Sequence, residues 1–156
     1  LVLAAIEGPL LLGGLGQYLP VVGKAVHPLG LAYQMANDML DILGDDGGTE
    51  ALSDLRKGSP NVVLVSFRNK LNRGNQSEFD LWMESPGSEN FENIAEEILT
   101  GPCLNHCCKR LEQCLEEFQS HCSILPNNLQ YAMEPLIAYL QYITKSVSQL
   151  AKETSS

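Results

Sequence analysis

The chain has 156 residues, a length that suits one domain and is too short for two ordinary ones. With 44% apolar and 19% charged residues it can bury a core, so the composition excludes a disordered protein. Ten basic against 19 acidic residues give a formal net charge of -9. This charge argues against nucleic acid or an anionic membrane as the main partner, because both select for basic surfaces.

Apolar positions recur every three or four residues instead of alternating, which predicts an all-α protein. The most apolar stretch is interrupted by an acid, a proline and four glycines, so we expect a kinked, buried helix over residues 1–19. For the same reason the stretch is a poor membrane span and a poor signal peptide. A second helix is predicted over residues 23–43, with Gly44 as its C-terminal stop.

The middle of the chain is less regular. Residues 45–53 are polar and glycine-rich and are expected to form a loop, whereas the apolar residues 61–71 are expected to form a buried helix in spite of their strand propensity. Loops around a short helix are predicted for residues 72–90. We expect one domain over residues 1–150, followed by a frayed tail over 151–156. Three further helices are predicted, over residues 91–99, 102–122 and 126–150.

All five cysteines lie in the 102–122 helix, on its apolar side. A secreted disulfide framework would distribute them over loops, so we expect reduced, buried thiols and a reducing intracellular compartment such as the cytoplasm. The run Cys103-x-x-His106-Cys107-Cys108 contains zinc-type ligands. Ligands on one helix rarely complete a tetrahedron, however, and the apolar stripe already explains the sulfurs.

Acidic residues interrupt the apolar pattern at the end of the 23–43 helix. Asn37, Asp41 and Asp45 are spaced four residues apart, with Asp38 beside them, so helical geometry places them near one face. Their carboxylates repel one another, and their oxygens suit Mg²⁺, which completes its coordination with water and substrate phosphate. The alternative is a solvated helix end whose acids face water, and the spacing alone does not choose between the two.

Two strings in this region carry a family resemblance: LGLAYQMANDMLDILGD, which starts at Leu29, and SDLRKGSPNVVL, which starts at Ser53. They resemble the trans-prenyl diphosphate synthases, in which a second Asp-rich motif follows Phe-Gln and precedes Gly-Asp and Asp-Leu-x-x-Gly-Lys elements. Helices over residues 1–16 and 101–143 look like the neighbouring helices of that family. The resemblance spans nearly the whole chain, as the C-terminal half of a family member. The matching positions are Tyr33-Gln34, Asn37-Asp38-x-x-Asp41, Gly44-Asp45 and Asp54-Leu55.

This resemblance implies a helical bundle of the isoprenoid synthase type, around an apolar cavity with Mg²⁺ at its mouth. In the family, the metal binds the diphosphate group of an allylic prenyl diphosphate. Loss of this diphosphate gives an allylic cation, which isopentenyl diphosphate then attacks. The implied metal ligands are Asn37, Asp38, Asp41 and Asp45, with Asp38 and Asp41 as the catalytic pair. The expected diphosphate contacts are Gln34, Arg56 and Lys57. The expected cavity wall is Leu12, Leu15, Leu31, Tyr33 and Met35, although a plain core explains each of these as well.

The chain also departs from the family. Asn37 stands where the family has Asp, and Thr49 and Ser59 stand where it has lysines that contact the diphosphate. Three readings therefore stay open: a synthase, a terpene cyclase of related fold, and a non-catalytic regulatory subunit of a prenyltransferase. Because the chain begins with Leu1 and matches only half of a family member, we expect an upstream segment or a partner subunit, and a dimer of the whole.

Overall fold

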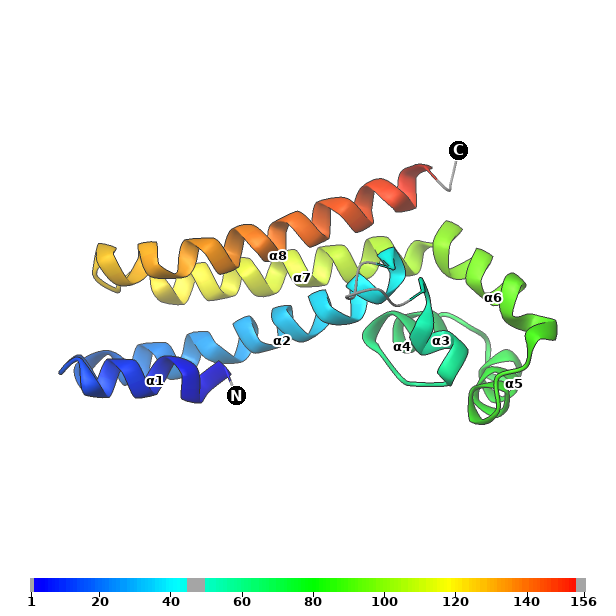
Figure 1. Ribbon diagram of the computed structural model, residues 1–156, viewed down its shortest axis with the longest axis horizontal. Coiled ribbons are helices and arrows are strands. Elements are labelled where there is room, and N and C mark those ends of the chain that lie inside the picture. Colours follow the sequence, from blue (N-terminus) through cyan, green and yellow to red (C-terminus); the bar gives the residue numbers. More distant parts are fainter. Residues whose placement is uncertain (1, 45–49, 154–156) are drawn as a thin grey trace.

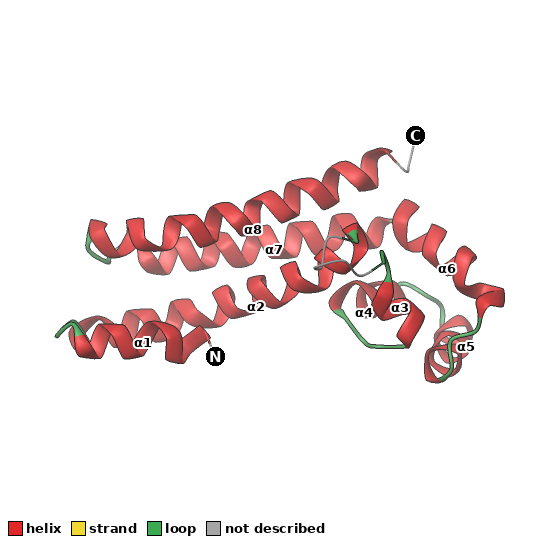
Figure 2. Cartoon of the chain, in the orientation of Figure 1, coloured by secondary structure: helices red, strands yellow, loops and turns green. Residues whose placement is uncertain are grey.

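The computed structural model describes residues 2–44 and 50–153, without the side chains of residues 2–5 and 88. All regular structure in these residues is helical, which confirms the all-α prediction (Figures 1 and 2). The elements are α1 (Val2–Leu12), η1 (Gly16–Tyr18), α2 (Leu19–Leu43), α3 (Ser53–Lys57), α4 (Val62–Arg68), α5 (Arg73–Glu84), α6 (Ser88–Thr100), α7 (Pro102–Cys122) and α8 (Asn127–Glu153).

Helices α1, α2, α7 and α8 form an elongated bundle, and helices α3 to α6 gather at one of its ends (Figure 1). Helix α2 is central to the bundle, because it packs against α1, α7 and α8. The pairs α1–α2 and α7–α8 each run antiparallel, as short connections require. The second half of α2 brings its acidic residues next to α3 and α4.

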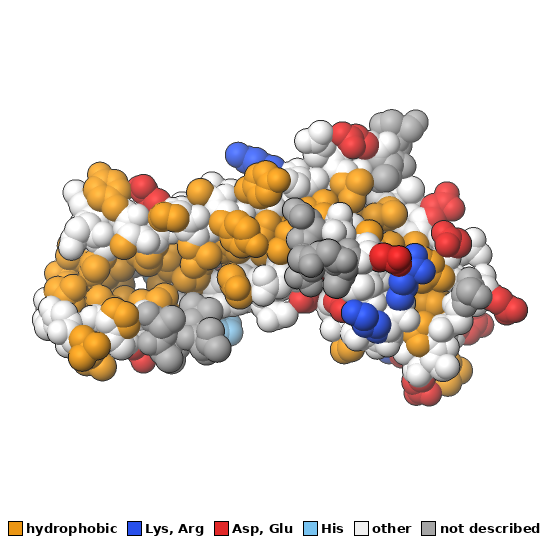
Figure 3. Space-filling model, in the orientation of Figure 1, with side chains coloured by type: hydrophobic (Ala, Val, Ile, Leu, Met, Phe, Trp, Pro, Cys, Tyr) orange, Lys and Arg blue, Asp and Glu red, His pale blue; other side chains and the backbone are white. Residues whose placement is uncertain are grey.

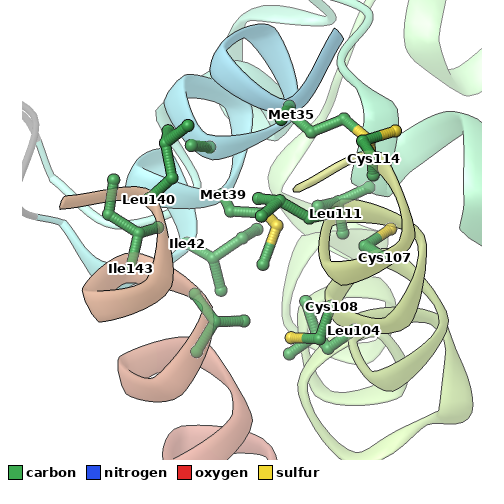
Figure 4. Packing of buried hydrophobic residues seen from close by; sticks show 14 of the residues in the cluster. Met35, Met39, Ile42, Leu104, Cys107, Cys108, Leu111, Cys114, Leu140 and Ile143 are labelled. Carbon is green, nitrogen blue, oxygen red and sulfur yellow. The ribbon is translucent and has the colours of Figure 1, made fainter. Parts of the chain in front are cut away.

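The core lies between α2, α7 and α8 (Figure 4). Figure 4 shows Met39 and Ile42 of α2 facing Leu111 of α7 and Leu140 of α8, and all four side chains are almost fully buried. The five cysteines of α7 form no disulfide and are buried in this core, as the apolar stripe predicts. No helix among the described residues combines the length and apolar character needed to cross a membrane.

The predicted first helix is shorter in the structure and the second is longer. Helix α1 ends at Leu12, because Gly14 adopts a left-handed φ of 71° and the chain turns through η1. Helix α2 then begins at Leu19, four residues earlier than expected. Pro20 allows this start, since proline is well tolerated in the first turn of a helix.

Two further differences concern the middle and the end of the chain. Helix α3 was not predicted; it is closed by Gly58, whose φ is 66° and where a Cβ atom would collide with the carbonyl oxygen of Met83. Helix α5 has 12 residues and is longer than expected. Helix α8 continues to Glu153, so the expected tail over 151–156 starts too early: Ala151 is helical and buried, and its packing holds the last turn.

Candidate metal and diphosphate site

The predicted metal ligands lie at the C-terminal end of α2, where α3 and α4 approach it. Asp41 is buried, with 4% of its surface exposed, and Asp38, one turn earlier, is half-buried. Asn37 is also half-buried. The structure therefore describes three of the four predicted ligands on one stretch of α2, and Asp45 lies outside the described residues.

Asp41 is enclosed by hydrogen bonds from the start of α3. The Ser53 hydroxyl donates to Oδ1 of Asp41 at 2.7 Å, and the backbone N–H of Asp54 donates to both carboxylate oxygens at 3.3 and 3.2 Å. The N–H of Leu52 donates to the Asp41 carbonyl at 2.8 Å. Leu52 has a φ of 60°, a conformation that costs a side-chain-bearing residue roughly 1–2 kcal/mol. Contacts to Asp41 thus hold a strained turn in place.

Asp38 is bound in the same way to the start of α4. The N–H of Val62 donates to Oδ2 of Asp38 at 2.7 Å, and the side-chain amide of Gln34 donates to Oδ1 at 2.8 Å. A negative charge at this position is favourable, because backbone N–H groups at a helix N-terminus point toward it. Asp38 therefore fixes α4 against α2.

Asn61 connects the two helix starts. Its side-chain amide donates to Oδ2 of Asp54 at 2.9 Å, and its Oδ1 accepts from the N–H of Leu64 at 2.9 Å, which caps α4. The three acids Asp38, Asp41 and Asp54 thus belong to one network, which we call the acidic network. The sequence indicates Asp38 and Asp41 as site residues, but it does not indicate the donors that bind them. Ser53 and Asn61 are signals for them, because both precede or begin a helix.

The acidic network has an excess of negative charge. Burial raises the pKa of Asp38, and the carboxylates of Asp54 and Asp41 raise it further, while the hydrogen bonds from Val62 and Gln34 oppose this shift. One base reaches this network: the ammonium of Lys57 lies 3.5 Å from the Ser53 hydroxyl. A cation placed beside Asp38 would relieve the remaining repulsion.

The residues fit Mg²⁺ unequally. A carboxylate can accept about four hydrogen bonds or metal contacts, and Mg²⁺ usually takes only one or two protein carboxylates. Asp38 is accessible and keeps acceptor capacity, so it fits the role. Both oxygens of Asp41 are occupied and buried, so Asp41 fits only if α3 moves away. Within the described residues, no three Asp, Glu, His or Cys side chains are arranged around one metal position.

The expected diphosphate contacts are divided between two places. Gln34 and Lys57 lie at the acidic network through Asp38 and Ser53. Arg56 points elsewhere: its guanidinium lies 3.9 Å from the Phe91 ring centroid, and its Nε is 3.6 Å from the Glu50 carboxylate. Of the two positions expected to lack lysines, Ser59 follows Gly58, the C-cap of α3, and Thr49 lies outside the described residues.

The expected cavity-wall residues do not form one surface. Leu31 and Met35 of α2 line a common groove with residues of α4 and α7. Leu12 is 92% exposed at the end of α1, Leu15 is half-buried beyond it, and Tyr33 is exposed on α2. Two of these five residues therefore meet in this groove.

Comparison with known proteins finds no protein-family model, no curated protein and no solved structure that matches the chain. A functional assignment therefore depends on the motifs at the end of α2 and on the geometry around them.

Proposed function

We propose that this chain is the metal-binding half of an isoprenyl diphosphate synthase-like enzyme. It would be a Mg²⁺-dependent prenyltransferase that ionises an allylic prenyl diphosphate and elongates it with isopentenyl diphosphate. The observation that carries the proposal is the run of motifs from Tyr33-Gln34 to Asp54-Leu55. Support comes from the position of Gln34, Asp38 and Lys57 around one end of α2.

Each side chain has a part in this chemistry. Bound Mg²⁺ would supply positive charge to the leaving diphosphate. Asp38 would hold the ion, while Gln34 and Lys57 would donate hydrogen bonds to phosphate oxygens. Apolar walls such as Leu31 and Met35 would keep water from the carbocation. An N-terminal half or a partner subunit would complete the cavity, within a dimer in a reducing compartment that suits the buried thiols.

A non-catalytic regulatory subunit is a second candidate, and a specific observation favours it. Both carboxylate oxygens of Asp41 accept hydrogen bonds from α3, and Ser59 brings no ammonium group to the site. A chain that no longer binds substrate could keep its acids for such structural contacts. The two candidates differ in whether Mg²⁺ and pyrophosphate bind at Asp38.

Thermal unfolding of the complete protein tests the metal site. Mg²⁺ with pyrophosphate should raise the melting temperature, by an amount that grows with the logarithm of ligand concentration above Kd, and Asp38→Ala should abolish the shift. Asn37→Asp restores the charge of the family motif and should strengthen binding. Asp80→Ala is a matched control, because Asp80 pairs with Arg68 on the surface and should keep the full shift.

Asp41→Ala should destabilise the protein without ligand, and it should also abolish the shift, because the proposed metal binding moves α3 away and brings Asp41 to the ion. The substitution leaves the Ser53 hydroxyl and the Asp54 N–H without their acceptor, which costs about 1–3 kcal/mol each when such groups are buried. If Asp38→Ala and Asp41→Ala both keep the wild-type response to Mg²⁺ and pyrophosphate, the proposed metal site is wrong.

Product analysis separates the candidate activities. Longer diphosphates made from allylic and isopentenyl diphosphates support the synthase, and Thr49→Lys with Ser59→Lys should increase their rate of formation. Hydrocarbons or alcohols made without isopentenyl diphosphate would replace it with the terpene cyclase. No turnover in either assay would overturn the enzymatic proposal in favour of the regulatory subunit.

A further inference from the structure

A cleft opens between α4, α5 and α6, at the end of the bundle where α3 to α6 gather (Figure 1). Its volume is about 230 Å³, which suits a compact chemical group better than a long chain. Three aromatic side chains line it in sequence. The ring centroids of Phe67 and Phe79 are 5.4 Å apart, and those of Phe79 and Trp82 are 6.3 Å apart. The two phenylalanines are buried and Trp82 is half-buried, so among these rings a ligand reaches the indole.

Helical geometry places acceptor groups on both sides of this cleft. Glu78 precedes Trp82 by four residues in α5, and Asn93 precedes Glu97 by four residues in α6, so the members of each pair are neighbours on their helix. All four residues line the cleft, and the two helices therefore present them across one small space.

The charge of the cleft is negative and uncompensated. In the part of the chain that the structure describes, no Lys, Arg or His lines it. Neither Glu78 nor Glu97 forms an ion pair with a described side chain. Carboxylates beside an accessible indole ring favour a cation, because the ring face attracts positive charge as well.

We propose that this cleft binds a guanidinium group. A guanidinium is planar and weakly hydrated, so it stacks on the Trp82 ring while the N–H groups at its edge donate to the carboxylates of Glu78 and Glu97. It has more N–H donors than an ammonium group, and the side-chain oxygen of Asn93 accepts a further one. Both a free guanidine compound and an arginine side chain of a peptide carry this group.

This site goes beyond the proposed function. None of its lining residues is a predicted metal ligand, diphosphate contact or cavity-wall residue, and the ligand is a cation, whereas the proposed substrate is an anion. Binding needs no Mg²⁺. Failure of the metal site at Asp38 and failure of this cleft are therefore separate outcomes.

Fluorescence titration tests the proposal, because Trp82 is the one tryptophan of the sequence. In the presence of a chelator, agmatine represents the free guanidine compound and N-acetyl-arginine methylamide represents the peptide side chain. At least one of them should change the Trp82 emission and saturate at one molecule per chain, and the tighter of the two identifies the source. The corresponding citrulline compound has a similar shape without the charge, and it should bind about tenfold more weakly or worse.

Matched variants test the two carboxylates. Glu78→Gln with Glu97→Gln should weaken binding by about tenfold, as expected for losing charged hydrogen bonds. Glu84→Gln with Glu96→Gln removes the same charge from exposed positions of α5 and α6 outside the cleft, and it should bind within about twofold of wild type. Equal binding of the citrulline compound or of the corresponding lysine compound, unchanged affinity of the Glu78 and Glu97 double variant, or no saturable binding of either guanidinium compound would overturn the proposal.

Discussion

Asp38 carries its charge where burial and two neighbouring carboxylates disfavour it, so its pKa is raised above the ordinary value of 3.8. Two donated hydrogen bonds offset only part of this effect. A carboxylate of this kind stabilises the fold through its contacts and destabilises it through its charge. The two contributions can be separated, because only the second changes with pH.

At pH values between 3.8, the pKa of Asp38 in the unfolded chain, and its higher pKa in the native protein, the folded chain binds more protons at Asp38 than the unfolded chain does. The contribution of Asp38 to the free energy of unfolding is therefore largest at low pH and is lost as pH rises through the native pKa. Asp38→Asn removes this dependence. Measured by urea unfolding from pH 4 to 7, the stability of Asp38→Asn relative to wild type should rise with pH.

Asp80 provides a control of opposite sign. Its hydrogen bond with Arg68 lowers its pKa, so the contribution of Asp80 is present at neutral pH and is lost as pH falls. The stability of Asp80→Asn relative to wild type should fall as pH rises toward 3.8 from below, and it should be nearly constant from pH 4 to 7. If the difference in stability between Asp38→Asn and wild type does not change with pH, the pKa of Asp38 is not raised.

Helix α7 gathers every thiol of the chain on its buried face. Burial raises the pKa of Cys103, Cys108 and Cys122 to about 11, and it also raises the pKa of the other two. Against an ordinary value of 9.0, a pKa of about 11 lowers the reactive thiolate fraction at pH 8 about 100-fold. These thiols should thus be poor nucleophiles in the native protein.

Alkylation at pH 8 should accordingly be slow in the native state and fast in urea, as followed by mass spectrometry. Ser120→Cys adds an exposed thiol on the same helix and serves as an internal standard that should react at once. If three or more native cysteines react as fast as this standard, the five thiols do not belong to the core.

The long helices could be predicted from the sequence because their signals are local. Helix α7 begins at Pro102 and ends at Cys122 as its apolar stripe and first-turn proline predict. The left-handed Leu52 could not be predicted, since leucine normally avoids that conformation and adopts it here through contact with Asp41.

The acids of the candidate site could be predicted from the sequence, but their hydrogen-bond partners could not. Asp41 and Ser53 are 12 residues apart, and Asp38 and Val62 are 24 residues apart. Spacing along one helix indicates which acids share a face, but it does not indicate which later backbone N–H group reaches them. The enclosure of Asp41 is therefore visible only in three dimensions.

The whole molecule exposes more surface than its mass predicts. Its accessible area is 9090 Å², whereas a compact monomer of 17.1 kDa has roughly 7,800 Å². Figure 3 shows apolar side chains in a continuous band between α8 and the α1–α2 pair. Exposed apolar residues of α1, α8 and the turn before α8 include Leu11, Leu12, Ile124, Tyr131, Tyr139 and Tyr142.

The accessible area above the value expected for a compact monomer is comparable to the area that one partner buries in a stable interface. The protein should therefore co-purify with an N-terminal helical segment or a partner subunit, or form a dimer, as measured by light scattering coupled to chromatography. Tyr139→Lys with Tyr142→Lys should weaken that association, and Leu81→Lys on α5 should not. A monodisperse monomer of residues 1–156 that melts cooperatively would contradict this prediction.

The elongated bundle of Figure 1 also determines how the molecule moves in solution. A compact domain of 156 residues has a radius of gyration of about 15 Å, and a rod-like arrangement of the same chain exceeds this value. Its friction is higher than that of a sphere, so even a monomer elutes early from a sizing column. Tumbling is slowest end over end. The backbone N–H bonds of α2, α7 and α8 run along the long axis of the molecule. The relaxation of their ¹⁵N nuclei should therefore report the slow end-over-end rotation directly.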